Sequence, residues 1–177
     1  MVAAKRRWTV LAWLFTALAG AACDPEPDWR RVESEQGRYS VSFPSEPRTN
    51  VQRAESDYGE HQVTFTLSTL GGVTYAVMYV DYPVEALTST AKVLDLAVEG
   101  ALGDLGCKDA TQKQVRLGEF EGRAFRCTNP GGRPVLARVY LVGRRLYRLS
   151  VSGLNRSADP VGASKFFDSF ELRLGVP

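Results

Sequence analysis

The chain has 177 residues, of which 44% are hydrophobic, and its 22 Lys and Arg residues nearly balance 20 Asp and Glu residues. This length is enough for one ordinary domain with a hydrophobic core. The small net charge gives no case for a nucleic-acid partner.

The first 23 residues resemble the signal sequence of a bacterial lipoprotein. Residues 5–7 are Lys-Arg-Arg, and an apolar run over 8–19 follows, which is too short to span a bilayer. Small residues lead to Cys23, as in a lipobox, where the cysteine is acylated and becomes the N-terminus; Gly20 stands where Leu is usual. Cleavage after Ala22 without lipid attachment is the alternative, because small residues also suit a soluble-export peptidase.

Removal of residues 1–22 leaves a mature chain with 19 Lys and Arg against 20 Asp and Glu. Residues 23–37 contain two prolines, several carboxylates and little apolar periodicity, so they predict a lipid-attached flexible tether. A single globular domain over 38–177 should follow. We expect it in the bacterial cell envelope, facing the periplasm or the exterior, held to the membrane by the lipid on Cys23.

The first half of this domain reads as strands. Residues 39–43 alternate apolar and polar side chains and stop at Pro44, and residues 48–54 and 62–67 are also extended in pattern. Residues 73–80 are apolar at successive positions, which predicts a strand that is covered on both faces.

A helix and further strands come next. Ser89 or Thr90 caps a helix that ends at Gly106. Strands are expected over 112–117, 123–128, 134–142 and 145–151, and short turns make the last three a meander of hairpins. A second helix starts near Asp159-Pro160 and precedes an end piece over 171–174. The order predicts an α+β domain, an antiparallel sheet covered by helices.

Three segments resemble PsbP-like domains. YSVSFP at 39–44 is similar to their opening strand, LVGRRLYRL at 141–149 to a late hairpin, and FFDSFEL at 166–172 to the closing helix and end strand. The resemblance covers most of 38–174 and implies an α/β/α sandwich around a central antiparallel sheet. This is the fold of the lumenal photosystem II PsbP subunit and of a small Ran-binding protein family. It implies a domain that binds a partner or supports an assembly, and it assigns no metal or binding residue here.

Cys107 and Cys127 remain as a pair once Cys23 carries the lipid. In an oxidising compartment such a pair is usually a disulfide, which would close a loop of about twenty residues. A metal site is the competing interpretation, but two thiols and one distant histidine provide too few ligands. We expect no metal and no cofactor.

Charge is distributed unevenly along the chain. Residues 24–104 contain six Lys and Arg against fourteen Asp and Glu, whereas residues 111–156 contain ten against two. Arginines recur on the predicted hairpin strands, and those considered for an anion-binding patch are Arg126, Arg138, Arg145 and Arg148. Such a patch would suit anionic lipid head groups, polysaccharide or an acidic protein face. Alternatively, the acidic half of the chain folds against these arginines and neutralises them.

No catalytic motif is evident. His61 is the single histidine, with Asp57 and Glu60 nearby, and a histidine beside carboxylates is a candidate general base. The sequence therefore predicts a non-enzymatic binding or assembly-support domain, and the alternative is an envelope hydrolase that uses His61 with nearby carboxylates.

Overall fold

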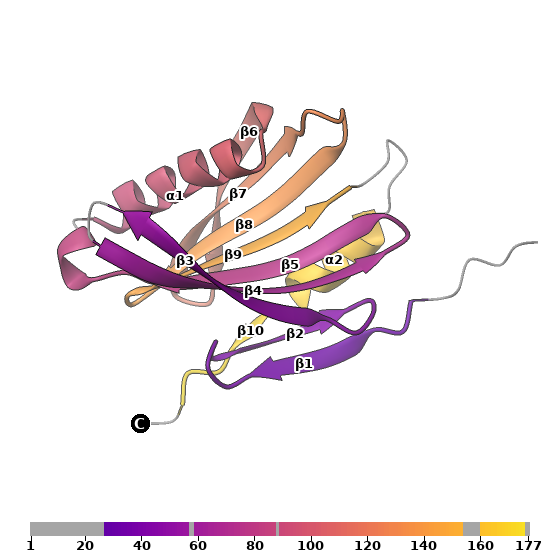
Figure 1. Ribbon diagram of the computed structural model, residues 1–177, viewed down its shortest axis with the longest axis horizontal. Helices are drawn as coiled ribbons and strands as arrows, with labels where there is room; N and C mark the ends of the chain where they lie inside the picture. The colour runs from indigo at the N-terminus through magenta and orange to yellow at the C-terminus, as the bar shows by residue number, and fades with distance from the viewer. Residues whose placement is uncertain (1–26, 57–58, 88, 154–159, 176–177) are drawn as a thin grey trace, which may run out of the picture.

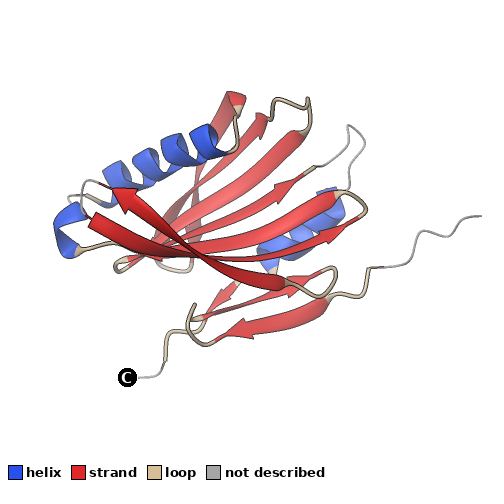
Figure 2. Cartoon of the chain, in the orientation of Figure 1, coloured by secondary structure: helices blue, strands red, loops and turns tan. Residues whose placement is uncertain are grey.

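The computed structural model describes residues 27–56, 59–87, 89–153 and 160–175. The predicted signal sequence and Cys23 lie outside the described residues, as does Asp57. The described chain forms a large antiparallel sheet with a helix on each face and a small sheet beside one helix (Figures 1 and 2). This confirms the expected α+β sandwich around a central antiparallel sheet.

The large sheet has seven strands in the described chain, each antiparallel to its neighbours. In spatial order they are β3 (Arg48–Ser56), β4 (Gly59–Leu70), β5 (Val73–Asp81), β9 (Arg145–Ser152), β8 (Pro134–Val142), β7 (Phe120–Thr128) and β6 (Lys108–Leu117). Every strand predicted in this part of the sequence is present, including the meander of hairpins. β5 is inside the sheet, which explains its apolar side chains on both faces.

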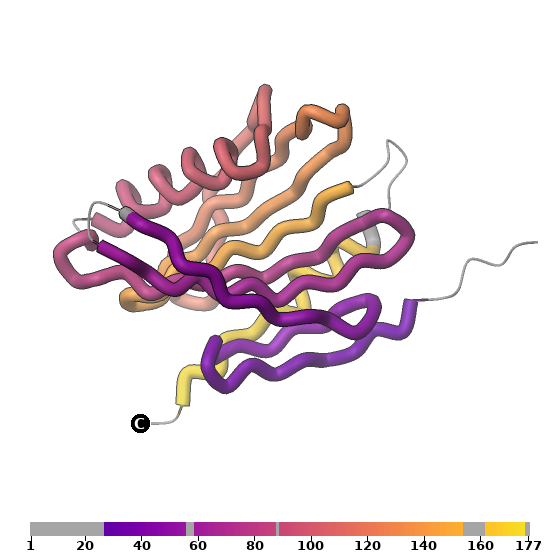
Figure 3. Tube along the Cα trace, viewed as in Figure 1, coloured from indigo at the N-terminus to yellow at the C-terminus, as the bar shows by residue number. Residues whose placement is uncertain are grey.

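The small sheet joins the two ends of the folded domain. β2 (Tyr39–Phe43) pairs with β1 (Arg30–Ser34) and with β10 (Glu171–Leu172), so the indigo and yellow ends of the chain meet (Figure 3). β1 corrects the prediction of a flexible tether over 23–37. Val32 is the only apolar residue of β1, so no alternation of apolar and polar residues predicts a strand here. The segment is a strand because it pairs along its whole length with the buried strand β2. The folded domain therefore begins before residue 38.

Helix α1 (Thr90–Asp104) covers one face of the large sheet. The Ser89 hydroxyl accepts a hydrogen bond from the backbone N–H of Lys92, as expected of an N-cap. At the other end Gly106 adopts φ +60°, and the N–H groups of Gly106 and Cys107 donate to the carbonyls of Gly103 and Leu102. This pair of bonds is the Schellman motif, so the helix ends where the sequence predicts. A short 3₁₀ helix (Val84–Ala86) leads into α1.

Helix α2 (Pro160–Asp168) covers the opposite face, together with the small sheet. Phe166 and Phe170 are 0% and 3% exposed, and they pack with Tyr39, Tyr147 and Phe43 of the neighbouring strands. Phe166 within α2 and Phe170 just after it therefore anchor the helix over this face of the sheet.

A disulfide joins Cys107 to Cys127, with the two Cα atoms 5.6 Å apart. It connects the end of α1 to the end of β7, and it confirms the pairing expected from the sequence. Disulfides persist in oxidising compartments, so this bond indicates an extracytoplasmic domain. None of the helices in the described ranges is long and apolar enough to cross a membrane.

Candidate functional site

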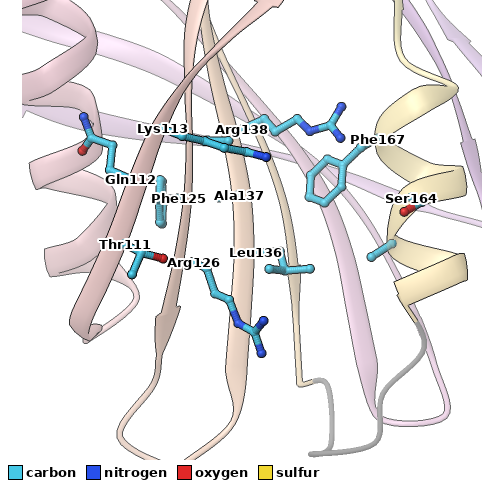
Figure 4. A pocket seen from close by; sticks show the side chains of 12 residues that line it. Thr111, Gln112, Lys113, Phe125, Arg126, Leu136, Ala137, Arg138, Ser164 and Phe167 are labelled. Carbon is cyan, nitrogen blue, oxygen red and sulfur yellow. The ribbon is translucent and has the colours of Figure 1, made fainter.

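A cavity of about 540 Å³ lies between α2 and strands β6, β7 and β8 (Figure 4). We call it the α2 groove and define it by Lys113, Arg126, Leu136, Arg138, Ala163 and Phe167. Two of the residues along its sides, Ala124 on the sheet and Ala163 on the helix, have small side chains. The groove therefore exists because alanines stand where larger side chains would fill the space between sheet and helix.

The strand register brings three cationic side chains to the same face of the sheet. Lys113 is opposite Ala124 of β7, and Ala124 is opposite Arg138 of β8. Arg126 is two residues beyond Ala124 and therefore points to the same face. Because neighbouring strands are about 4.8 Å apart, all three cationic residues are close neighbours of Ala124 on this face of the sheet. No acidic residue is among the described residues that line the groove.

Arg138 is held against α2. Its Nη1 donates to Oδ1 of Asp168 over 3.3 Å, and its guanidinium carbon lies 4.7 Å from the centre of the Phe167 ring. Figure 4 shows the side chain directed toward Phe167. Burial raises the pKa of the neighbouring Tyr140, and the charge of Arg138 partly opposes this rise. With one long contact to a carboxylate that is 68% exposed, Arg138 retains donors for a ligand.

Lys113 and Arg126 form no ion pair with another residue in the described part of the chain. Both side chains are exposed, and Figure 4 shows Arg126 directed toward the end of the sheet where β7 turns into β8. The groove thus offers two unneutralised cations and one partly neutralised guanidinium beside apolar side chains. This arrangement can bind carboxylate or phosphate groups attached to an apolar body.

The other two arginines considered for the patch lie elsewhere. Arg145 is on the α2 face but at the opposite end of the sheet, where its Nε and Nη2 donate to the carboxylate of Asp81 over 2.6 and 2.5 Å. Arg148 points to the α1 face and donates to Asp104 over 3.0 Å. The structure therefore brings together Arg126 and Arg138 but neither Arg145 nor Arg148. Lys113 is a third cation of the groove that was not predicted, although Lys113, Val115 and Leu117 alternate on one side of β6.

The acidic half of the chain accounts for several arginines of the basic half. Arg145 pairs with Asp81, Arg148 with Asp104, and Arg123 with Asp95. The alternative of mutual neutralisation is thus correct for these three, whereas the acid beside Arg138 is Asp168, close to the C-terminus.

His61 lies on β4, half-buried, with its ring 6.1 Å from the ring of Tyr82. Glu60, one of the two carboxylates considered with it, is 3.6 Å from Arg53. Among the described residues no group of three His, Cys, Asp or Glu side chains is placed to hold a metal ion.

No family model matches the sequence, and no curated protein matches it. Among solved structures the chain is similar to CyanoP, the cyanobacterial PsbP of Synechocystis, with a TM-score of 0.54 and 13% identity over 88% of this chain and 98% of that chain. A Pseudomonas aeruginosa protein of unknown function aligns with a TM-score of 0.32 and 10% identity over 76% of this chain and 85% of that chain, which is too weak for any argument. The likeness to CyanoP shows that this chain has the PsbP-like fold.

Proposed function

We propose that this chain is a lipid-anchored binding domain of the bacterial cell envelope, attached through Cys23, that holds an acidic segment of a partner protein in the α2 groove. The observation that carries the proposal is the group of three cationic side chains around Ala124, next to the apolar side chains of α2. The domain acts by binding and supports an assembly at the membrane surface.

The mixed lining of the groove favours a protein segment over the other anionic partners. Phosphate head groups and acidic polysaccharide would bind the cations, but they have no apolar groups to pack against the Leu136 and Phe167 side chains between those cations. A segment that alternates carboxylates with apolar side chains uses both. A cavity of about 540 Å³ is large enough for several side chains.

The entry of the chain into the domain supports a partner near the membrane. The Trp29 ring lies 5.8 Å from the Tyr75 ring, and Nζ of Lys165 lies 4.8 Å from the centre of Trp29. Lys165 belongs to α2, the helix that forms one wall of the groove. The lipid on Cys23, only six residues before Trp29, would therefore hold this helix close to the bilayer.

Photo-cross-linking in intact cells tests the proposal. A cross-linking amino acid at Ser164, an exposed residue of the groove wall, should capture a specific envelope protein. Charge reversal with Lys113→Glu and Arg126→Glu should reduce this capture at least tenfold, because the acidic segment would then meet like charges. A cross-linker at Glu99, which is exposed on α1, is the control position.

The matched control variant is Lys92→Glu with Arg48→Glu, which changes the net charge equally but alters exposed residues outside the groove. It should leave capture from Ser164 unchanged. The proposal fails if Ser164 and Glu99 capture the same proteins equally, or if both double variants reduce capture to the same extent.

A further inference from the structure

Several turns gather at the end of the sheet where Arg145 lies. Arg38 of the β1–β2 turn, the β8–β9 turn (143–144) and Phe120, the first residue of β7 after the β6–β7 turn, line a second cavity of about 400 Å³. We call it the turn pocket. The residues that matter for its chemistry are Arg38, Asp81, Phe120, Arg144, Arg145 and Leu174. It shares no lining residue with the α2 groove.

Arg145 and Tyr147 build the floor of the turn pocket. Besides its two bonds to Asp81, Arg145 donates through Nη1 to the carbonyl of Gln36 over 2.6 Å, and its guanidinium stacks 4.7 Å from the centre of the Tyr79 ring. The Tyr147 hydroxyl donates to the next carbonyl, that of Gly37, over 2.7 Å. Two side chains of β9 thus hold two successive carbonyls of the β1–β2 turn. Arg145 is fully engaged by these contacts and has little capacity left for a ligand.

Arg38 follows these two carbonyls and has an unusual backbone conformation. Its φ is +53°, in the left-handed region where Gly and Asn are the ordinary residues. Its carbonyl accepts a hydrogen bond from the backbone N–H of Arg173, so the turn is fixed on both sides. The turn needs only the backbone of residue 38. The long cationic side chain of Arg38 has no role in forming the turn, and a strained backbone position with such a side chain is typical of a functional residue.

Charge in the turn pocket is not balanced. Asp81 is the acidic residue among the described lining residues, and it faces three arginines. The pKa of Asp81 is lowered first by the hydrogen bonds from Arg145, and further by the charges of Arg144 and Arg38. Since Arg145 and Asp81 neutralise each other, Arg38 and Arg144 remain as two cations, and neither forms an ion pair with a described residue.

We propose that the turn pocket binds a phosphate monoester, with Arg38 and Arg144 as the phosphate ligands and Phe120 and Leu174 against the organic group. Two guanidinium groups balance the two charges of a phosphate monoester, and each carries paired N–H donors that suit phosphate oxygens. Asp81 keeps Arg145 on the floor and prevents it from adding a third charge. The phosphate monoester belongs either to a soluble metabolite or to a lipid head group.

Binding measurements on the full mature chain in detergent test this site. Calorimetric titration with phenyl phosphate reports the soluble source, and co-sedimentation with phosphatidylcholine vesicles that do or do not contain phosphatidic acid reports the lipid source. Arg144→Gln and Arg38→Gly should each weaken binding at least about tenfold, since each removes a charged hydrogen-bond donor. Arg38→Gly also removes the backbone strain, so its loss of binding should come without any loss of thermal stability.

Arg48→Gln, which removes an exposed arginine of β3 that lines neither the turn pocket nor the α2 groove, is the matched control and should leave affinity unchanged. The proposal is supported by saturable binding that depends on Arg38 and Arg144. Binding to phenyl phosphate identifies a soluble phosphate monoester as the ligand, and binding to phosphatidic acid identifies a lipid head group. The proposal is overturned if the wild-type chain binds neither probe, or if Arg48→Gln weakens binding as much as Arg144→Gln. The phosphate-binding measurements can therefore succeed or fail independently of whether a cross-linker at Ser164 captures a partner protein.

Discussion

Arg145 and Arg148 are three residues apart in one strand and point to opposite faces of the sheet. Each meets a carboxylate from the acidic half of the chain, Asp81 for Arg145 and Asp104 for Arg148. The side chains of the two arginines are only 16% and 11% exposed, so these pairs hold partly buried charges that would be costly to leave alone. Arginines that appear clustered in the sequence are therefore separated by strand parity, and most are engaged inside the fold.

The pair of Arg145 and Asp81 predicts a pH dependence of stability. Arg145 lowers the pKa of Asp81 below its ordinary value, which is about 3.9 in an unfolded chain. A carboxyl group with a lowered pKa in the folded state stabilises the protein above that ordinary pKa, and this stabilisation is lost as the pH falls through the folded-state pKa. Asp81→Asn should therefore reduce the free energy of unfolding at pH 7, and its difference from wild type should shrink below about pH 4.

Chemical denaturation of both proteins between pH 7 and pH 2.5 measures this difference. Asp168→Asn is the control, because the exposed Asp168 makes one contact of 3.3 Å with Arg138 and such pairs contribute little. Parallel stability profiles for wild type and Asp81→Asn would contradict the prediction.

At the level of elements, the sequence predicts the bounds of a strand best where buried and exposed residues alternate along it. The bounds of β8, Pro134–Val142, follow from its alternating burial and from the turn residues on both sides. β1 could not be predicted, because its pairing with β2 and not its own pattern makes it a strand. β6 begins four residues earlier than predicted, since its first part is exposed and contains an irregularity between Lys108 and Thr111.

The same limits apply to the α2 groove. Strand parity correctly places Arg126 and Arg138 on one face, because β7 and β8 form a predicted hairpin. Lys113 could not be added from the sequence, since its place beside Ala124 depends on the register of β6 against β7. The position of α2 over these strands depends on the packing of Phe166 and Phe170, which no local pattern reveals.

The disulfide connects two elements and should contribute to stability. It closes a loop of twenty residues from the end of α1 to the end of β7. The closed loop lowers the conformational entropy of the unfolded chain, which stabilises the folded state by roughly 3 kcal/mol. Cys107→Ala with Cys127→Ala should therefore lower the free energy of unfolding by about this amount. Guanidinium denaturation measures the change, and wild type under dithiothreitol serves as a control with unaltered side chains. Equal stability of the oxidised and reduced wild type would contradict the prediction.

At the scale of the whole molecule, the lipid attachment that we propose at Cys23 would determine where the domain can act. We expect metabolic labelling with a palmitate analogue to label the wild-type protein, whereas Cys23→Ala should remain unlabelled because its lipid-accepting thiol is absent. The Cys107→Ala variant should keep its label, since that thiol belongs to the disulfide. Equal labelling of wild type and Cys23→Ala would contradict lipidation at this position.

The start of the folded domain at β1 shortens the tether and restricts its reach. Six residues, 24–29, separate Cys23 from Arg30, and Trp29 is already packed against Tyr75. At about 3.5 Å per extended residue, Trp29 lies within roughly 20 Å of Cys23, the proposed site of the lipid. Removal of residues 1–22 leaves Trp29 as the only tryptophan of the chain, so its fluorescence reports this distance without any label.

Energy transfer from Trp29 to dansyl head groups in vesicles should therefore be efficient for the lipidated wild-type protein. Insertion of twenty Gly and Ser residues between Glu26 and Pro27 adds a flexible segment with a root-mean-square length of about 25 Å, so transfer should fall clearly. A chain that starts at residue 24 and carries no lipid is the control and should show no transfer. If the inserted segment leaves transfer unchanged, the domain itself binds the bilayer, and the short tether does not set its distance from the membrane.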